Sequence, residues 1–374
     1  MSKTSARTNT LSPSEKFILL AQTGIPLLLK GMPGEGKTAY INALARAAGR
    51  DIETIIASIR DASEMGGLPM EKPEGIVMHP PAWAVRLAKS KAPILFFDEI
   101  TCVMPAGQAA LLRIIHERVV GELKLPDNIW MLAAANPPEV AANGWELSPP
   151  MANRFAHLNW ELSREAWEDG MITGFKDPKV DVLPDNWREG IPRARALVAS
   201  FIHVKPSLLR AFPKTQADQG GPWPSPRSWD MAATVFAAAE SVGADPYDLV
   251  RCCVGDGAAL EFGQYVKNAD LPDPMSMLNN PEEIQWTANR DDRAYAMLAS
   301  VTAFVIGRND PKLWERAFLV LESAVKANKK DLAAVSMPQL LKNQPKGATL
   351  PVKQVSLVYG ILEAAKLTPN SKTK

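Results

Sequence analysis

Short runs of consecutive apolar residues alternate with helical patterns over the first 135 residues. The runs are apolar throughout, which is typical of strands buried on both faces of a parallel sheet. We expect strands at residues 25–30, 52–57, 94–97 and 129–135, and helices at residues 37–48 and 105–120. Strands that alternate with helices predict an α/β fold, with a parallel sheet between two layers of helices.

The pattern changes after about residue 160, where strand-like runs become scarce. Residues 203–227 are dense in proline and glycine. Helical patterns then dominate, at residues 228–241, 247–254, 292–306, 312–326 and 352–367. We therefore divide the chain into a flexible polar arm (1–14), an α/β core (15–160), a helical region (161–265) and a second helical region (266–374) that ends in a polar tail from residue 368.

A glycine-rich loop separates the first expected strand from the first helix. Residues 31–38 read GMPGEGKT and fit the pattern GxxxxGK[S/T]. The glycines let backbone N–H groups wrap around phosphate oxygens, and the helix adds the positive end of its dipole. We expect Lys37 to reach the β- and γ-phosphates of ATP and Thr38 to bind Mg²⁺. The predicted nucleotide-binding residues are Gly31, Met32, Pro33, Gly34, Glu35, Gly36, Lys37, Thr38, Ala39 and Asp98. A chance glycine-rich turn is the alternative, which the flanking strand and helix disfavour.

Two acids follow the apolar run ILFF at residues 94–97. Asp98 falls at the carboxyl end of a buried strand, where parallel sheets bind ligands. We expect it to hold Mg²⁺ together with Thr38. Glu99 is then placed to activate the attacking water. A solvated strand end is the alternative for this pair taken without the glycine-rich loop.

Asn136 ends the last expected strand and precedes two prolines. Its amide is a candidate for positioning the lytic water beside the γ-phosphate. Taken without its neighbours, an asparagine before proline is more typical of a local turn.

Four segments share their order and spacing with a known family: GMPGEGKT, ILFFDE, AAANPPE and LSPPMANRF. They resemble the AAA+ ATPases, specifically the MoxR family of the helix-2-insert clade. The segment QAALLRIIHER at residues 108–118 is similar to a helix of that family. The resemblance covers residues 15–160. It implies a P-loop sheet sandwiched by helices, then an α-helical lid at 161–265 and a helical C-terminal region.

The resemblance also implies roles for three polar residues. Asn136 looks like the sensor-1 residue, and Arg154 looks like the arginine finger that enters a neighbouring subunit's site. This sequence has Asn153 where the family often has aspartate. By residue type alone, Arg154 is more typical of a surface arginine that caps a helix.

The third of these residues is Arg227, which follows the serine and proline of the segment SPRS at residues 225–228. Ser225 and Pro226 suit a helix start, which puts Arg227 in the first turn, where the helix dipole disfavours a cation. The segment is similar to the family's sensor-2 motif, and the resemblance implies that Arg227 contacts the γ-phosphate from the lid. An ordinary solvated arginine is the alternative.

Two further segments are candidates for client contact. In this family an insert, often a hairpin that faces the ring pore, falls at about residues 60–91. Met65, Leu68 and Pro69 are its candidate contact residues, and an ordinary surface loop is the alternative. Residues 119–125 are a candidate second hairpin.

Charge and composition limit the classes of partner that we expect for this protein. Lys and Arg number 42 and Asp and Glu 41, which gives no electrostatic reason to expect nucleic acid. No apolar run is long enough for a membrane span. The three cysteines and four histidines lack metal-ligand spacing, which fits a reduced, cytoplasmic setting.

We therefore expect a Mg-ATP-hydrolysing enzyme. The resemblance implies a homohexameric ring that remodels or matures a client, often a protein with a von Willebrand factor A domain. Two alternatives stay open at this point: a scaffold that binds nucleotide without hydrolysis, and an AAA+ motor stimulated by nucleic acid.

Overall fold

The chain divides into two compact units. A computed structural model describes residues 11–56, 59–73, 75–137, 139–140, 145–269 and 271–364. One unit comprises residues 1–185 and 210–259, and the other comprises residues 186–209 and 260–374. Each unit buries its own apolar cluster.

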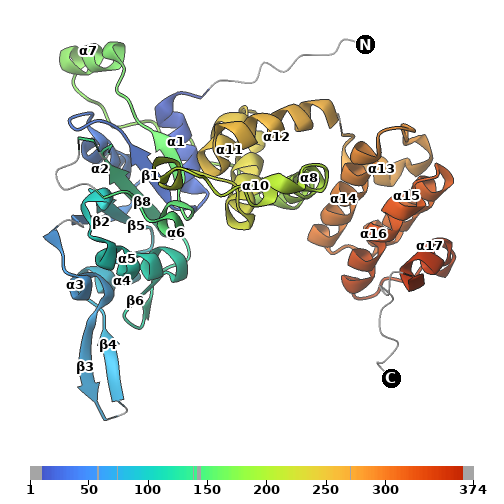
Figure 1. Cartoon of the computed structure of the whole chain (residues 1–374), viewed down its shortest axis with the longest axis horizontal. Coiled ribbons are helices and arrows are strands. Elements are labelled where there is room, and N and C mark those ends of the chain that lie inside the picture. Colours follow the sequence, from blue (N-terminus) through green and yellow to red (C-terminus); the bar gives the residue numbers. More distant parts are fainter. Residues whose placement is uncertain are drawn as a thin grey trace. The chain divides into compact units, whose positions relative to one another are not determined.

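Five parallel strands form the sheet of the first unit, in the order β2-β5-β8-β1-β9 (Figure 1). Their bounds are β1 Leu27–Lys30, β2 Asp51–Ile56, β5 Pro93–Asp98, β8 Trp130–Ala135 and β9 Ala156–Asn159. Lys30 at the end of β1 is in register with Ala135 on one side and Asn159 on the other. Because the strands are parallel, the loops after β1, β5 and β8 emerge at one edge of the sheet.

Helices cover both faces of this sheet, which confirms the predicted fold class (Figure 1). They are α1 Pro13–Gln22, α2 Lys37–Ala47, α3 Ala62–Gly66, α4 Ala82–Lys89, α5 Pro105–Glu117 and α6 Pro149–Ala152. Strand residues Leu28 and Phe97 belong to one buried cluster with Leu111 of α5 and Trp83 of α4. Each such side chain contributes about 1.5–3 kcal/mol through its burial.

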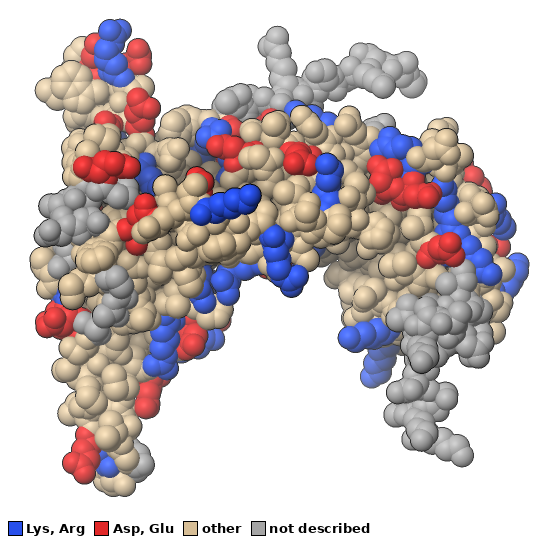
Figure 2. Space-filling view, in the orientation of Figure 1, with Lys and Arg blue, Asp and Glu red and all other residues tan. Residues whose placement is uncertain are grey.

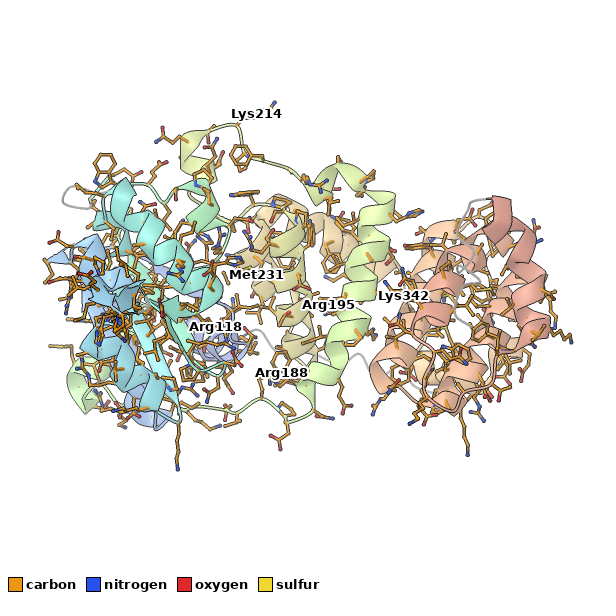
Figure 3. All side chains as sticks on the ribbon, turned by 90° about the horizontal axis from the view of Figure 1, so that it is seen from below. Arg118, Arg188, Arg195, Lys214, Met231 and Lys342 are labelled. Carbon is orange, nitrogen blue, oxygen red and sulfur yellow. The ribbon has the colours of Figure 1, made fainter. Side chains whose placement is uncertain are left out.

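The predicted strands and the helix at 37–48 are confirmed to within two residues. Ala57, the last residue of one predicted strand, lies outside the described residues. The helix predicted at 105–120 is wrong at its end, because α5 stops at Glu117. Arg118 has a left-handed backbone with φ 56°. Its guanidinium donates to the carbonyls of Asp127 and Gly24, which fixes the turn (Figure 3).

Two hairpins occupy the segments that the sequence singled out. β6 Val119–Val120 pairs with β7 Leu123–Lys124, as expected for the second one. β3 Leu68–Lys72 pairs with β4 Gly75–His79 and projects from the first unit.

Uncharged residues make up most of the surface of the projecting β3–β4 hairpin (Figure 2). Leu68 is 58% exposed and Ile76 is 77% exposed. Of the three residues predicted to contact a client, Leu68 and Pro69 are exposed. Met65 is 1% exposed, so its prediction is wrong. It is buried in the cluster under the sheet, because α3 packs against α5.

Several elements were not predicted from the sequence. α1 begins at Pro13, inside the segment assigned to a flexible arm, because Ser12 and Glu15 form a capping box. Residues 1–10 of that arm lie outside the described residues. β9 and the helix α7 (Arg164–Thr173) also carry no clear periodic signal.

The remaining helices are distributed over both units. The first unit holds α9 Gln216–Gln219, α10 Pro226–Ser241 and α11 Tyr247–Val254. The second holds α8 Ile191–Val204, α13 Pro274–Asn279, α14 Asp291–Arg308, α15 Pro311–Lys326, α16 Lys330–Lys342 and α17 Val352–Ala364. α12 Asp256–Ala269 crosses the boundary between them. Figure 3 labels Arg188, before α8, and Arg195 on it.

The second unit is helical in its described part, as predicted. The helices expected at 228–241 and 247–254 in the first unit, and at 292–306 and 312–326 in the second, are confirmed within two residues. The end of the one expected at 352–367 lies outside the described residues. Trp314 is fully buried there and donates its indole N–H to the carbonyl of Leu340 at 2.9 Å. Across the described residues, no helix combines the length and the apolar character that a membrane span requires.

Gly31 allows β9 to approach the start of the glycine-rich loop. A Cβ at this position would lie 2.4 Å from the carbonyl oxygen of Trp160. We expect Gly31→Ala to lower the free energy of unfolding by about 1–3 kcal/mol, since backbone must move to accept the methyl group. Gly257→Ala in α12 is the matched control, because a Cβ there meets open space. It should be neutral or stabilising by up to about 1 kcal/mol. Equal urea midpoints for the two variants would contradict the close approach.

Candidate nucleotide-binding site

The glycine-rich loop leaves the sheet at the end of β1 and enters α2. Gly31 N–H donates to the carbonyl of Ala135 at 3.2 Å, which fixes the start of the loop to β8. Gly34 has φ 87° and Gly36 has φ 72°, a backbone region that other residues rarely adopt. A Cβ at either position would meet no atom within 4 Å, so both glycines border open space.

Lys37 holds the loop and the end of β8 together. Its Nζ donates to the carbonyls of Gly31 and Met32, each at 2.8 Å, and to Asn136 Oδ1 at 2.9 Å. The side chain is 8% exposed. Burial lowers the pKa of Lys37, while the charges of Asp98 and Glu35 oppose that shift. The structure therefore brings the side chain of Asn136 to Lys37.

Thr38 and Asp98 meet as the sequence predicted. Thr38 Oγ1 donates to Asp98 Oδ2 at 2.8 Å, and the backbone N–H of Glu99 donates to Asp98 Oδ1 at 3.0 Å. A hydroxyl beside an ionised carboxylate is a donor set that suits Mg²⁺, which prefers oxygen ligands. The residues present therefore fit the metal ion that the motif implies.

Glu99 adopts a left-handed backbone conformation with φ 55° and ψ 42°. This conformation costs a non-glycine residue about 1–2 kcal/mol. Such strain is concentrated at active sites, where the surrounding structure maintains it. Glu99 is exposed, beside Asp98 at the edge of the sheet.

A cavity of about 390 Å³ connects these groups. It is lined by Pro33, Gly34, Gly36, Lys37, Thr38, Ala39, Asp98, Glu99, Ala134, Ala135 and Asn136. Of the described residues predicted to act here, Arg154 and Arg227 do not line it. Gly31, Met32 and Glu35 line the neighbouring cavity instead.

Arg154 lies between α6 and β9, and its Nη1 donates to the carbonyl of Pro150 at 2.6 Å. Asn153 does not pair with this guanidinium. It is 5% exposed and accepts from Ser225 Oγ at 2.6 Å, while its Nδ2 donates to the carbonyl of Trp223 at 3.1 Å. Asn153 therefore joins the start of α10 to the core.

This junction places Arg227 close to Arg154. Ser225 caps α10 and forms a capping box with Ser228, as the sequence indicated for a helix start. Burial lowers the pKa of Arg154, and the positive charge of Arg227 lowers it further. The two arginines therefore influence each other electrostatically, and neither lines the phosphate cavity.

Glu35 connects the glycine-rich loop to the chain that leaves the sheet. Its Oε2 accepts from the backbone N–H of Leu162 at 2.8 Å, and its carbonyl accepts from the indole N–H of Trp160 at 3.0 Å. The ring centroids of Trp160 and Tyr40, which lies in α2, are 4.3 Å apart. Sequence reasoning missed Trp160, because an indole after an edge strand has no motif of its own.

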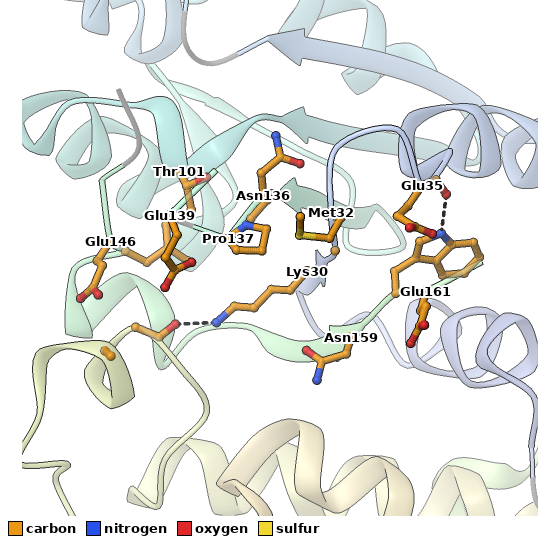
Figure 4. Close-up of a pocket in the computed structure, with 16 residues that line it drawn as sticks. Lys30, Met32, Glu35, Thr101, Asn136, Pro137, Glu139, Glu146, Asn159 and Glu161 are labelled. Atoms are coloured by element: carbon orange, nitrogen blue, oxygen red, sulfur yellow. Dashed lines mark hydrogen bonds between the residues drawn. The ribbon is translucent and has the colours of Figure 1, made fainter. Parts of the chain in front are cut away.

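A second cavity, of about 510 Å³, adjoins the first (Figure 4). Asn136 lines both cavities. Lys30, at the end of β1, extends into the second cavity and donates to the carbonyl of Gly220 at 2.9 Å. Burial lowers the pKa of Lys30 to about 8, against the opposing charge of Glu146. Sequence reasoning had treated Lys30 only as the end of a strand.

A glycine-rich loop between a strand and a helix, with an acid pair at the end of a neighbouring strand, defines a P-loop nucleotide-binding protein. Residues 26–155 match the AAA domain (dynein-related subfamily). Together with the five-stranded sheet, this match makes the first unit's α/β part an AAA+ core.

No curated protein matches this chain. Among solved structures, the chain is similar to a 2.00 Å crystal structure of "a putative ATPase" from Cytophaga hutchinsonii. The two are 19% identical with a TM-score of 0.42, over 66% of this chain and 78% of that one.

The lowered pKa of Lys30 predicts a pH-dependent stability. Between about pH 8 and the ordinary value of 10.5, the unfolded chain keeps a proton that the folded chain loses. Rising pH then favours the folded state. The free-energy cost of burying the charged Lys30 is fully present below about pH 8 and falls as the pH rises above it.

We therefore expect Lys30→Met to stabilise the protein relative to wild type near about pH 7. That gain should shrink by about 1–3 kcal/mol near about pH 10. Denaturant unfolding at both pH values measures it. Lys89→Met, at an exposed position of α4, is the control. Its free energy of unfolding should differ from that of wild type by the same amount at both pH values. A gain for Lys30→Met that does not change with pH would refute the assignment.

Proposed function

We propose that this protein is a Mg-ATP-hydrolysing AAA+ ATPase of the MoxR type, which works as a ring oligomer and remodels or matures a partner protein. One observation carries the ATPase part of this proposal. Lys37, Thr38, Asp98 and Asn136 are joined by direct hydrogen bonds around one cavity, with Glu99 on its lining.

Each group has a task that its position allows. The open N–H groups of the loop and the start of α2 bind phosphate oxygens, and Lys37 exchanges its backbone acceptors for them. Thr38 and Asp98 hold Mg²⁺, which neutralises phosphate charge. Asn136 orients the attacking water, and Glu99 takes its proton. The left-handed backbone of Glu99 costs free energy, and a protein that only binds nucleotide does not need it. We therefore favour a hydrolysing enzyme over a non-hydrolysing scaffold.

The position of the basic pair supports assembly. Arg154 and Arg227 are adjacent to each other and outside the lining of their own chain's phosphate cavity. We propose that Arg154 serves the site of the next subunit, where it stabilises charge that develops on the transferred phosphoryl group. For Arg227 we propose contact with the γ-phosphate from the helical lid.

The client is proposed to bind at the projecting β3–β4 hairpin. Leu68, Met70 and Ile76 are large apolar residues that it exposes to solvent. Exposed apolar clusters on a soluble unit are typical of protein contact sites. By the resemblance, the client is a protein with a von Willebrand factor A domain.

The catalytic assignment predicts separable effects of two substitutions. Lys37→Ala should abolish both ATP binding and hydrolysis, because the phosphates lose their cation. Glu99→Gln should lower kcat by about 100-fold to 10,000-fold and leave ATP binding intact, because it removes only the base. Phosphate release and calorimetric binding measure the two properties. The control is Glu282→Gln at an exposed site of the second unit. Wild-type turnover in both variants would exclude the assignment.

Sharing of arginines between subunits predicts complementation. Arg154→Ala and Lys37→Ala should each be inactive when purified. A mixture should regain part of the activity, because a chain with an intact Lys37 receives Arg154 from its neighbour. Steady-state hydrolysis over a titration of the two chains measures this. If the mixture is no more active than its components, although the two chains co-assemble, Arg154 does not act between subunits.

A further inference from the structure

Glu35 places an acid inside a loop whose geometry suits the binding of anions. It stands between Gly34 and Gly36, whose φ angles are 87° and 72°. A carboxylate close to bound phosphates repels them, so an acid at this position opposes the proposed function of the loop. A residue that stands against local preference is a candidate for a special role. The hydrogen bonds of Glu35 indicate what that role is.

Both the backbone and the side chain of Glu35 are bound to the segment that follows β9. The carbonyl of Glu35 accepts from the indole N–H of Trp160 at 3.0 Å (Figure 4). Its Oε2 accepts from the backbone N–H of Leu162 at 2.8 Å. We call these two hydrogen bonds the Glu35 anchor. They fix one residue of the loop at two points to the same short stretch of chain.

The indole that donates to Glu35 is itself held firmly. Trp160 is 8% exposed, and its ring centroid lies 4.3 Å from that of Tyr40 and 6.3 Å from that of Phe17. Its backbone N–H donates to the carbonyl of Lys30 at 2.6 Å, which continues the pairing of β9 with β1. The indole N–H is therefore held in place by the sheet and by two helices, α1 and α2.

The bond from Trp160 also sets the direction of an N–H group in the loop. A trans peptide is planar, and its C=O and N–H point in opposite directions. The peptide between Glu35 and Gly36 is trans, as are all the peptides that the structure describes. Because the carbonyl of Glu35 is turned toward Trp160, the N–H of Gly36 points away from it. Gly36 lines the phosphate cavity and Trp160 does not, so this direction leads toward the phosphates.

The neighbouring glycines make such an anchor necessary. Glycine adopts positive and negative φ angles about equally well, and Gly34 and Gly36 flank the Glu35 residue on both sides. Packing does not restrict them, because a Cβ on either glycine would meet open space. A half-turn of the peptide after Glu35 would point its carbonyl toward the phosphates, where the partial negative charge of the oxygen opposes binding. The Glu35 anchor excludes that orientation.

We propose that Trp160 and the carboxylate of Glu35 are positioning residues, which hold the N–H of Gly36 toward the phosphates of the nucleotide. The inference rests on the proposed function and adds two roles to the same site. Backbone N–H groups of such a loop bind the α- and β-phosphates, which are not transferred. They stabilise the ground state and the transition state equally, so the anchor acts on nucleotide binding rather than on the chemical step.

Trp160→Phe tests the proposal, because it removes the indole N–H and keeps an aromatic ring beside Tyr40. We expect the Kd of Mg-ADP, measured by calorimetry, to rise about threefold to tenfold, as for the loss of one hydrogen bond. Inorganic pyrophosphate, which has no base or ribose, should lose affinity by a similar factor. The KM for ATP should rise by that factor as well, while kcat changes by less than about twofold.

Trp314→Phe is the matched control, because Trp314 also donates its indole N–H to a backbone carbonyl, that of Leu340 in the second unit. This variant should lower the Tm and leave the Kd of both ligands unchanged. All binding is measured at a temperature at which circular dichroism shows each variant to be folded. An unchanged Kd in folded Trp160→Phe would overturn the proposal, and so would a loss of kcat at an unchanged KM.

A pair of substitutions isolates the carboxylate of Glu35. Glu35→Gln and Glu35→Ala both remove the charge, but only glutamine keeps an oxygen that accepts from the N–H of Leu162. We expect Glu35→Gln to bind Mg-ADP about threefold or more tightly than Glu35→Ala. Equal affinities would contradict the role of this side chain. These binding measurements do not depend on hydrolysis. Failure of the proposed function has a separate signature, which is ATP hydrolysis that survives Lys37→Ala.

Discussion

The ammonium group of Lys37 is the point on which the site depends. It reaches two carbonyls of the loop and the amide of Asn136 after β8, so it ties the loop, α2 and the end of β8 together. The parallel register of β1 with β8 makes this possible, because it brings Lys30 and Ala135 level at one edge. Thr38 and Asp98 extend the same edge toward β5. A change that shifted β1 by one residue would separate all of these groups at once.

Local patterns predicted much of this arrangement from the sequence. The runs at 94–97 and 129–135 are buried on both faces, and this continuous apolar character is itself the signal of a central strand. The loop at 31–38 requires its glycines at fixed positions, so the motif is visible without the fold. These features depend on interactions between near neighbours in the chain.

Other features depend on contacts between distant segments, and the sequence did not reveal them. The end of α5 is set by Arg118 reaching Gly24, a residue 94 positions away. Met65 was assigned to an exposed insert, yet α3 packs against α5 and Met65 is buried. The significance of Glu146 and Lys30 arises only when β1 and the segment around residue 220 come together. Asn153 differs from the aspartate that the family often has, and its amide serves Ser225 and Trp223 rather than Arg154.

Glu35 has a consequence for how the protein could perform mechanical work. It belongs to the loop that wraps the phosphates, and it also holds Leu162 and Trp160 at the exit of the sheet. The segment beyond them carries α7 and is anchored again where Asp177 pairs with Arg46 of α2. Glu35 and Arg46 thus connect the glycine-rich loop and α2 to the two ends of the segment that carries α7. A displacement of the loop would reach α7 from its start, and a displacement of α2 would reach it from its end.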